Sequence, residues 1–401
     1  MKRLLGLAAL CAALACGTAH AQQLSVKIGV LSDMSSLYAD LGGPGSVAAA
    51  KMAIADFMAQ HPDIKVELVS GDHQNKPDVG SSLAGQWYDV DKVDMIIDVP
   101  NSGVALAVSQ VANQKNKVFI VSGAGSSDLT GAKCNANTIH WTYDTWMLAN
   151  GTGKAIVKNG GDSWFFITAD YAFGYALEND TTAAVKAAGG KVLGGVRVPL
   201  NTSDFSSFLL QAQASKAKVV GLANAGGDTI NSIKQGAEFG IVSGGQKFAG
   251  LLVLASDIAA LGLPTAQGLT FTETWYWDMT DANREWTKRW QKERPNKVPT
   301  MVHAGVYAGI IHYLKAVEAL KSAADGKAVV AKMEEIPTDD QLFGKGSIRK
   351  DGRTIHPAYL FEVKKPSESK YFGDFYHLRA TIPADEAFRP LKDDHCPLVG
   401  G

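Results

Sequence analysis

The sequence predicts an α/β fold made of two Rossmann-like lobes, each with a parallel central sheet. Short β-rich runs alternate with longer amphipathic helical patterns, which indicates βαβ units. The alternation starts again near Trp164 and continues for a similar length, and the 401 residues exceed what one hydrophobic core usually organises. Because no low-complexity linker separates the two series, we expect the chain to cross between the lobes more than once through short hinges.

The first 21 residues are typical of an export signal. A basic pair at residues 2–3 precedes an apolar run over residues 4–15, and Ala19-His20-Ala21 fits a small-residue cleavage site. Cleavage after Ala21 would leave 380 of the 401 residues in the periplasm. Lipidation of Cys16 is the alternative, but the alanine three residues before it departs from the large aliphatic residue of lipoprotein signals.

The charges of the chain are mixed and nearly balanced. Lys and Arg total 39, Asp and Glu total 40, and the net charge is −1 before the two basic residues of the leader are lost. Charges so mixed attract neither nucleic acid nor an anionic membrane. Beyond the leader, no apolar run reaches the roughly 18 residues that span a bilayer. We therefore expect no nucleic acid partner and no direct membrane insertion.

Four cysteines occur in the chain, and two of them leave with the leader. The remaining Cys134 and Cys396 would lie in an oxidising compartment, where a disulfide would tie the C-terminal tail to the loop after Thr130. Two free thiols are the alternative. Without a Cys-x-x-Cys or His-x-x-Cys spacing these cysteines do not indicate a metal site, and we expect no cofactor.

The first series of elements accounts for most of one lobe. Alternating Val26, Ile28 and Val30 predict the first strand, and the segment Val-Asp-Met-Ile-Ile-Asp-Val at 93–99 resembles a strand buried on both faces. In chain order we expect a strand at 26–30, a Gly-Pro loop at 41–45, a helix at 47–58, and strands at 66–68, 93–99 and 118–121.

The second series repeats the pattern and is followed by a mixed segment. It comprises strands at 164–168, 191–198, 219–222 and 248–254 and helices at 173–188, 204–216 and 228–239. Helices at 282–293 and 301–320 come next. Two short strands, 344–348 and 358–363, then look like a hairpin around the turn Lys350-Asp351-Gly352-Arg353.

Four loops are candidates for ligand contacts, because ligands of open parallel sheets collect beyond the carboxyl ends of the strands. Glycines let backbone amides approach a ligand closely, hydroxyls donate hydrogen bonds, and tyrosines offer an apolar face with a polar tip. The candidates are Tyr38 in the first loop, Ser102 in the second, Ala124, Gly125 and Ser126 in the third, and the aromatics Trp141, Tyr143 and Tyr171. A helix cap at Ser102, a tight turn in the third loop and aromatic core residues are the plain alternatives.

These stretches resemble the branched-chain amino acid-type family of periplasmic binding proteins, which has the type I fold. The resemblance covers essentially the whole mature length and lies in the order and spacing of several motifs rather than in any single one. The matching stretches are Tyr38 to Gly45, Ser102-Gly103, Ala124 to Thr130, Asp170-Tyr171-Ala172-Phe173-Gly174 and the Gly-Ala-Glu-Phe-Gly run that ends at Gly240.

The resemblance implies two α/β lobes joined by three hinge crossings, with a ligand enclosed by hinge closure and delivered to an ABC permease in the inner membrane. The lobe boundaries that follow are a signal peptide at 1–21, the first lobe at 22–143 and 273–343, the second lobe at 144–272, and return strands of the second lobe with a C-terminal tail at 344–401. The protein would capture a small molecule without transforming it.

The family also implies ligand contacts. Its members hold a ligand carboxylate with a serine of the second loop and with backbone and hydroxyl groups of the third, which match Ser102, Ala124 and Ser126. Its aromatic contacts map to Tyr38 and Tyr171. Further aromatic side chains, Trp141, Tyr143, Trp275 and Tyr276, favour an aromatic ligand.

One departure from the family bears on the ligand. Amino acid binders place a carboxylate after a strand of the second lobe to receive the ammonium, whereas the segment 248–252 has no acid. Asp228 is a substitute for that acid or a cap of its own helix. Because a buried ammonium without a counter-charge costs several kcal/mol, we expect an aromatic or short organic acid without an α-amine, with an amino acid as the alternative.

A periplasmic hydrolase and a ligand sensor of the same fold are the two alternative function classes. A periplasmic hydrolase would leave a motif such as His-Glu-x-x-His or Gly-x-Ser-x-Gly, and the sequence contains neither. The pattern Ser347-Ile348-Arg349-Lys350 fits Ser-x-x-Lys but lies on an expected strand, and His303 and His312 fit a structural role on their helix. A ligand sensor with the same fold, acting on a separate receptor, is the remaining alternative.

Overall fold

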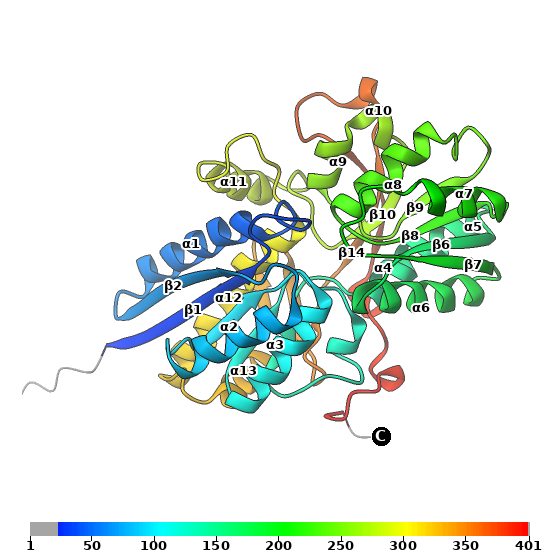
Figure 1. The fold of residues 1–401 in the computed structure, drawn as a ribbon. Helices are drawn as coiled ribbons and strands as arrows, with labels where there is room; N and C mark the ends of the chain where they lie inside the picture. The colour runs from blue at the N-terminus through cyan, green and yellow to red at the C-terminus, as the bar shows by residue number, and fades with distance from the viewer. Residues whose placement is uncertain (1–22, 400–401) are drawn as a thin grey trace, which may run out of the picture.

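The computed structural model describes residues 23–399, so the expected export signal and its cleavage site after Ala21 lie outside the described residues. Two parallel sheets lie at the centres of two lobes (Figure 1). The first sheet has the strand order β2-β1-β3-β4-β5, and the second has the order β7-β6-β8-β9. The expected α/β class with two parallel sheets is confirmed.

The first lobe is built mainly from the first third of the chain. Its elements are β1 (Leu24–Ser32), α1 (Gly43–Gln60), β2 (Ile64–Asp72), α2 (Pro77–Asp89), β3 (Met95–Asp98), α3 (Ser102–Lys115), β4 (Val118–Val121), η1 (Ser127–Leu129) and β5 (Thr138–His140). The later helices α11 (Asp281–Trp290), α12 (Met301–Leu320) and α13 (Gly326–Glu335) return to it. Helix α12 is buried along most of its length and packs on α1.

The second lobe contains the other parallel sheet. Its elements are α4 (Thr145–Leu148), η2 (Ala149–Gly153), α5 (Lys154–Lys158), β6 (Ser163–Ala169), α6 (Ala172–Ala187), β7 (Lys191–Val198), α7 (Ser206–Ala214), β8 (Val219–Ala223), α8 (Gly227–Glu238), β9 (Lys247–Gly250), α9 (Ala255–Leu261) and α10 (Leu263–Ala266). An antiparallel sheet of β10 (Thr270–Glu273), β14 (Ala358–Val363) and β15 (Tyr376–Ile382) completes it.

The expected hairpin between 344–348 and 358–363 is wrong. Strand β12 (Gly344–Ile348) instead pairs with β11 (Thr338–Asp340) and β13 (Thr354–Ile355), while β14 pairs with β10 and β15. A β-bridge between His140 and Arg353 joins this small sheet to the first lobe. Pro357 lacks an amide hydrogen, so it cannot continue the pairing and the chain leaves for the second lobe at this point.

Three segments of the chain therefore cross between the two lobes, in agreement with the family pattern. They lie between β5 and α4, between β10 and α11, and between β13 and β14. The exact lobe boundaries stay a prediction. Within the described chain, no helix is both long enough and apolar enough to cross a bilayer.

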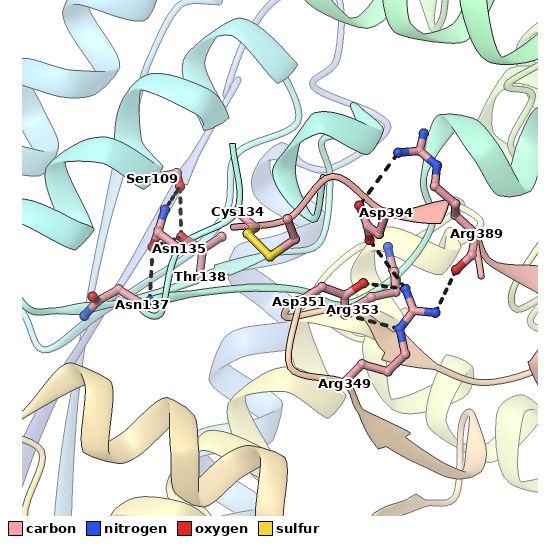
Figure 2. The surroundings of a disulfide bond; sticks show 11 residues. Ser109, Cys134, Asn135, Asn137, Thr138, Arg349, Asp351, Arg353, Arg389 and Asp394 are labelled. Atoms are coloured by element: carbon pink, nitrogen blue, oxygen red, sulfur yellow. Dashed lines mark hydrogen bonds and ion pairs between the residues drawn. A yellow bond between two sulfur atoms is a disulfide. The ribbon is translucent and has the colours of Figure 1, made fainter. Parts of the chain in front are cut away.

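The predicted disulfide is confirmed. Cys134, which follows η1, bonds Cys396 in the C-terminal tail, and their Cα atoms lie 5.5 Å apart (Figure 2). The tail reaches this point after β15, so the last residues of the chain run from the second lobe back to the first (Figure 1). Besides the three crossing segments, the disulfide thus closes a further covalent connection between the lobes.

Candidate functional site

The sheet topology places four of the predicted site residues at two switch points. Strand β1 lies between β2 and β3, and β6 lies between β7 and β8, so successive connections leave each central strand in opposite directions. Such a switch point opens a crevice at the carboxyl ends of the strands. The loops or helix starts after β1, β3, β6 and β8 carry Tyr38, Ser102, Tyr171 and Asp228.

Asp33, which was not predicted, organises the first loop. Its carboxylate accepts hydrogen bonds from the amides of Ser36 and Tyr38, at 2.9 and 2.8 Å, and from the side chain of Asn75, at 2.6 Å. Although burial acts to raise the pKa of Asp33, these bonds and the Ser36 hydroxyl hold it below its ordinary value. The backbone of Tyr38 is therefore fixed by a buried carboxylate.

The second and third loops are joined by one hydroxyl. Ser102 Oγ accepts hydrogen bonds from the amides of Gly125 and Ser126, at 3.3 and 3.1 Å, and its side chain is fully buried. Because the oxygen already accepts two hydrogens, the hydroxyl's own hydrogen is directed away from them. The structure thus brings together Ser102, Gly125 and Ser126, and their role as ligand contacts stays a prediction.

The cap of α3 is Asn101 rather than Ser102. Asn101 Oδ1 accepts from the amide of Val104 at 3.1 Å, and Ser102 is the first helical residue. The amides of the first turn of a helix have no intrahelical acceptor, so those of Ser102 and Gly103 face the same end of the helix as the Ser102 hydroxyl. This end of a helix favours an anion.

A strained bend precedes this helix and was not foreseen. Asp98 and Val99 both have positive φ angles, +91° and +53°, which are uncommon for non-glycine residues and cluster at functional sites. The carbonyl of Asp98 accepts from the amides of Ser122 and Gly123, and Ser32 Oγ donates to its carboxylate at 2.8 Å. Burial raises the pKa of Asp98 to about 6. The bend therefore locks the first three loops to one another.

The third loop is further fixed by two side chains from the crossing segment. Tyr143 donates to the carbonyl of Gly123 at 2.6 Å, and His140 Nε2 lies 2.8 Å from the carbonyl of Ala124. A Cβ on Gly125 would come within 2.8 Å of the rings of both Tyr143 and Phe173, so only glycine fits there. Ser126 Oγ accepts from the amide of Asp128 at 3.4 Å and caps η1.

The second lobe meets this assembly through a tyrosine pair. The hydroxyls of Tyr38 and Tyr171 lie 2.6 Å apart, although the residues come from opposite lobes. Burial is the main cause that raises the pKa of both phenols, so both stay protonated at neutral pH. The two predicted aromatic contacts thus lie side by side, and their contact defines a closed arrangement of the lobes.

Asp228 lies near this pair and does not cap its own helix. Its Oδ2 accepts from the amide of Asn201 at 3.1 Å, whereas Oδ1 is buried and has no hydrogen-bond partner among residues 23–399. Burial raises the pKa of Asp228 to about 6, and its charge contributes to the raised pKa values of Tyr38 and Tyr171. A ligand donor would satisfy the free oxygen.

The two predicted tryptophans pack elsewhere. The Trp141 ring lies on α12, 5.4 Å from the ring of His312, and a Cβ on Gly305 would lie 3.4 Å from it. Trp275 packs edge-on against Trp286 of α11, with ring centroids 5.6 Å apart. Among the contacts of the described residues, neither indole lies against the Ser102 hydroxyl. A contribution of Trp141 and Trp275 to ligand binding stays a prediction.

A cavity of about 590 Å³ lies beside the first loop. The first loop, α8 and α9 line it, with Ser36, Leu37, Asp40, Asn201, Gly226, Asn231 and Ser256 among the wall residues. Because both lobes contribute to the wall, the cavity lies between the lobes.

Comparisons with known proteins agree with this architecture. A sequence profile described as periplasmic binding protein matches residues 25–370. The chain belongs to the periplasmic binding protein family. A solved periplasmic binding protein from Burkholderia mallei is 50% identical, with a TM-score of 0.90, and the match covers 93% of this chain and 99% of that one.

Two further relatives indicate to which group of periplasmic binding proteins the chain is similar. A branched chain amino acid ABC transporter periplasmic ligand-binding protein from Burkholderia xenovorans is 38% identical with a TM-score of 0.81, over 93% of this chain and all of that chain. A Leu/Ile/Val-binding protein homolog 6 from Brucella melitensis is 28% identical over 361 residues, which are 87% of this chain and 90% of the relative. This periplasmic binding protein is therefore of type I and of the branched-chain amino acid family, whose members bind substrates for transporters and are not enzymes.

Proposed function

We propose that this periplasmic binding protein captures a small organic acid by its carboxylate and delivers it to an ABC permease in the inner membrane. The observation that carries the proposal is the arrangement around Ser102. Its hydroxyl accepts from the Gly125 and Ser126 amides and is left with one hydrogen to donate, beside the first amides of α3. Such a group of donors is complementary to a carboxylate oxygen.

The ligand class follows from what surrounds these donors. The buried Tyr38 and Tyr143 and the partly buried Tyr171 provide aromatic surface near the loops, and no acid occurs in residues 248–252 to receive an ammonium. Solved proteins of the same fold from Rhodopseudomonas palustris are in complex with benzoate and with 4-hydroxybenzoate, at 20% and 22% identity. We therefore favour an aromatic or short organic acid without an α-amine.

An amino acid is the second candidate, because Asp228 supports it. The unpartnered Oδ1 of Asp228 would receive an ammonium as readily as a hydroxyl. The relatives named for leucine, isoleucine and valine favour the same class. The two candidates differ in one chemical group, the α-amine.

Matched ligand pairs separate the candidates. Thermal unfolding is measured with 3-phenylpropanoate against phenylalanine and with 4-methylpentanoate against leucine, because each pair differs only by the α-amine. The proposal expects the acids without the amine, or benzoate and 4-hydroxybenzoate, to raise the melting temperature more than the amino acids do. Stabilisation by leucine or phenylalanine, with none by the deamino partners, would reject the organic acid in favour of the amino acid.

The transport partner is tested separately. The family implies a permease, and we expect genes for a membrane permease and an ATPase beside this gene. A receptor gene in their place would favour a sensor of the same fold. With the permease reconstituted in vesicles, the liganded protein should stimulate ATP hydrolysis more than the ligand-free protein does.

A further inference from the structure

The C-terminal tail contributes a side chain to the contact between the lobes. Arg389 lies in this tail and donates from Nη2 to Asp180 Oδ1 of α6 at 3.2 Å, and to Ser127 Oγ of η1 at 3.0 Å. The same Asp180 belongs to the second lobe, and Ser127 follows the ligand loop of the first. One guanidinium therefore bridges both lobes.

Asp180 is the centre of this contact. Its Oδ2 accepts from the hydroxyls of Ser127, at 2.8 Å, and Thr145, at 2.6 Å, while Oδ1 accepts from Arg389. The Asp180 side chain is only 15% exposed, and that of Arg389 19%. Separation of α6 from the loop that follows Ser126 would leave this carboxylate without its Ser127 partner, so the Ser127 bond belongs to the closed arrangement. Thr145 lies in the same lobe as Asp180, so its bond does not depend on closure.

The tail is held against the first lobe independently of α6. The carbonyl of Arg389 accepts from Arg349 Nη1 at 2.7 Å, and Asp394 lies 3.8 Å from Arg349 and 3.9 Å from Arg389. Arg349 in turn pairs with Asp351 (Figure 2). Two residues beyond Asp394, Cys396 is bonded to Cys134. The disulfide and this charged cluster therefore keep Arg389 with the first lobe when the lobes part.

The C-terminal tail also contacts residues 127–131, which follow the third loop. A Cβ on Gly131 would lie 3.2 Å from Arg389 Nη1 and 3.3 Å from Asp394 Oδ1, so the tail packs directly on the segment from Ser127 to Gly131. The amide of Ser127 donates to Thr145 Oγ1 at 3.1 Å. The amide of Ser126, immediately before it, donates to Ser102, so Ser127 is directly joined to the candidate ligand cradle.

We propose that Asp180, Arg389 and Ser127 form an interlobe latch that stabilises the closed state and positions the third ligand loop, and that the Cys134–Cys396 disulfide keeps Arg389 in place for it. Asp180 and Arg389 are positioning residues, not ligand contacts. The inference uses the hinge closure of the proposed function but does not depend on the identity of the ligand.

Hydrogen exchange of the ligand-free protein tests the latch. Amide exchange is followed by mass spectrometry in residues 122–131 and 172–183. Asp180→Asn and Arg389→Gln should each raise exchange in both segments about tenfold, and the double variant should exceed either single variant by less than about twofold, because both remove one interaction. The matched control is Arg379→Gln, which removes an ion pair with Glu362 inside the second lobe, and it should leave both segments unchanged.

The disulfide is tested in the same assay. Reduction with dithiothreitol should raise exchange in the wild type about as much as Arg389→Gln does, and should add little to Arg389→Gln. Unchanged exchange in both latch variants, an equal rise in Arg379→Gln, or a full additional rise on reduction of Arg389→Gln would overturn the proposal. If Arg389→Gln does not fold, Arg389→Lys and the reduced wild type decide by the same criteria. A failed ligand screen would leave this result unaffected.

Discussion

Two buried aspartates, one in each lobe, border the interlobe region and differ in how fully they are satisfied. Asp33 in the first lobe accepts hydrogen bonds with both oxygens, and these bonds hold its pKa below the ordinary value. Asp228 in the second lobe leaves one oxygen without a partner in the described chain, and burial raises its pKa to about 6. The first carboxylate supports the loops, whereas the second keeps one acceptor oxygen free within the described chain.

The same contrast holds for the loops around these residues. In the first lobe, Ser102, Gly125, Ser126 and Tyr143 hydrogen-bond within or to the second and third loops. The second lobe contributes Tyr171, whose hydroxyl lies against that of Tyr38, Phe173 beside Gly125, and Asp180, which accepts from Ser127. A half whose loops are already held by its own hydrogen bonds loses little conformational freedom when it binds a ligand, which suits a clamp.

The strongest test of this contrast removes each aspartate in turn. Asp33→Ala leaves the buried Tyr38 amide and the part-buried donors of Ser36 and Asn75 without this acceptor, and should lower the free energy of unfolding by about 3 to 5 kcal/mol. Asp228→Ala should cost far less or raise stability, because it removes a poorly satisfied charge. Urea denaturation of both variants measures the difference, and equal losses would contradict the contrast.

Loss of the disulfide should have the next largest effect. Cys134 and Cys396 are 262 residues apart, so the bond encloses the parallel sheet of the second lobe in a covalent ring, whereas residues 23–133 lie outside it. Cys134→Ser with Cys396→Ser should lower the free energy of unfolding by about 2 to 4 kcal/mol. Guanidinium denaturation measures it, with the single variant Cys396→Ser as a control. A loss below about 0.5 kcal/mol would show that the tail is held by the charged cluster alone.

The cradle of the first lobe is tested by affinity. Ser102→Ala removes a donor to the proposed carboxylate and should weaken binding of the best compound from the matched screen by about 1 to 3 kcal/mol. Ser81→Ala, on α2 away from the loops, is the control and should change nothing. Isothermal titration calorimetry measures both, and an unchanged affinity in Ser102→Ala would discredit the anion cradle.

The smallest expected effect concerns Asp228 and pH. A carboxyl whose folded pKa lies near 6, above its unfolded value of 3.8, binds its proton more tightly in the folded state, so the stability it contributes is lost as pH rises from about 4 to 6. Asp228→Asn should therefore gain about 1 to 2 kcal/mol more at pH 7.5 than at pH 4.5 relative to the wild type. Denaturation at the two pH values measures this gain, and an equal effect at both would contradict the raised pKa.

The fold was largely predictable from the sequence, because apolar periodicity is local. The strands at 118–121 and 191–198 and the helix at 301–320 have the bounds that were predicted. The hairpin expected at 344–363 was wrong, because strand periodicity does not reveal which strand a given strand pairs with. A crossing between the lobes at Pro357 separates the strands at 344–348 and 358–363. A proline at that position was the available signal.

The site was only partly predictable, because several residues that hold its loops in place are far from those loops in the sequence. Ser102, Gly125 and Ser126 came together as expected, but Asp33, Asp98 and Asn101 were missed. Asn101 had a local signal, since asparagine before a helix is a preferred cap. Asp33 and Asp98 act through partners up to 66 residues away, and the positive φ of Asp98 has no counterpart in the residue pattern. The role of Arg389 depends on a contact 209 residues away.

The most direct test of the account is a crystal structure of the protein with the compound that gives the largest thermal shift. The account predicts the acid group within about 3 Å of Ser102 Oγ and of an amide at the start of α3 or in the third loop, with Tyr171 closed over it. An acid group held by the second lobe alone, with the Ser102 hydroxyl left unbound to it, would contradict the account.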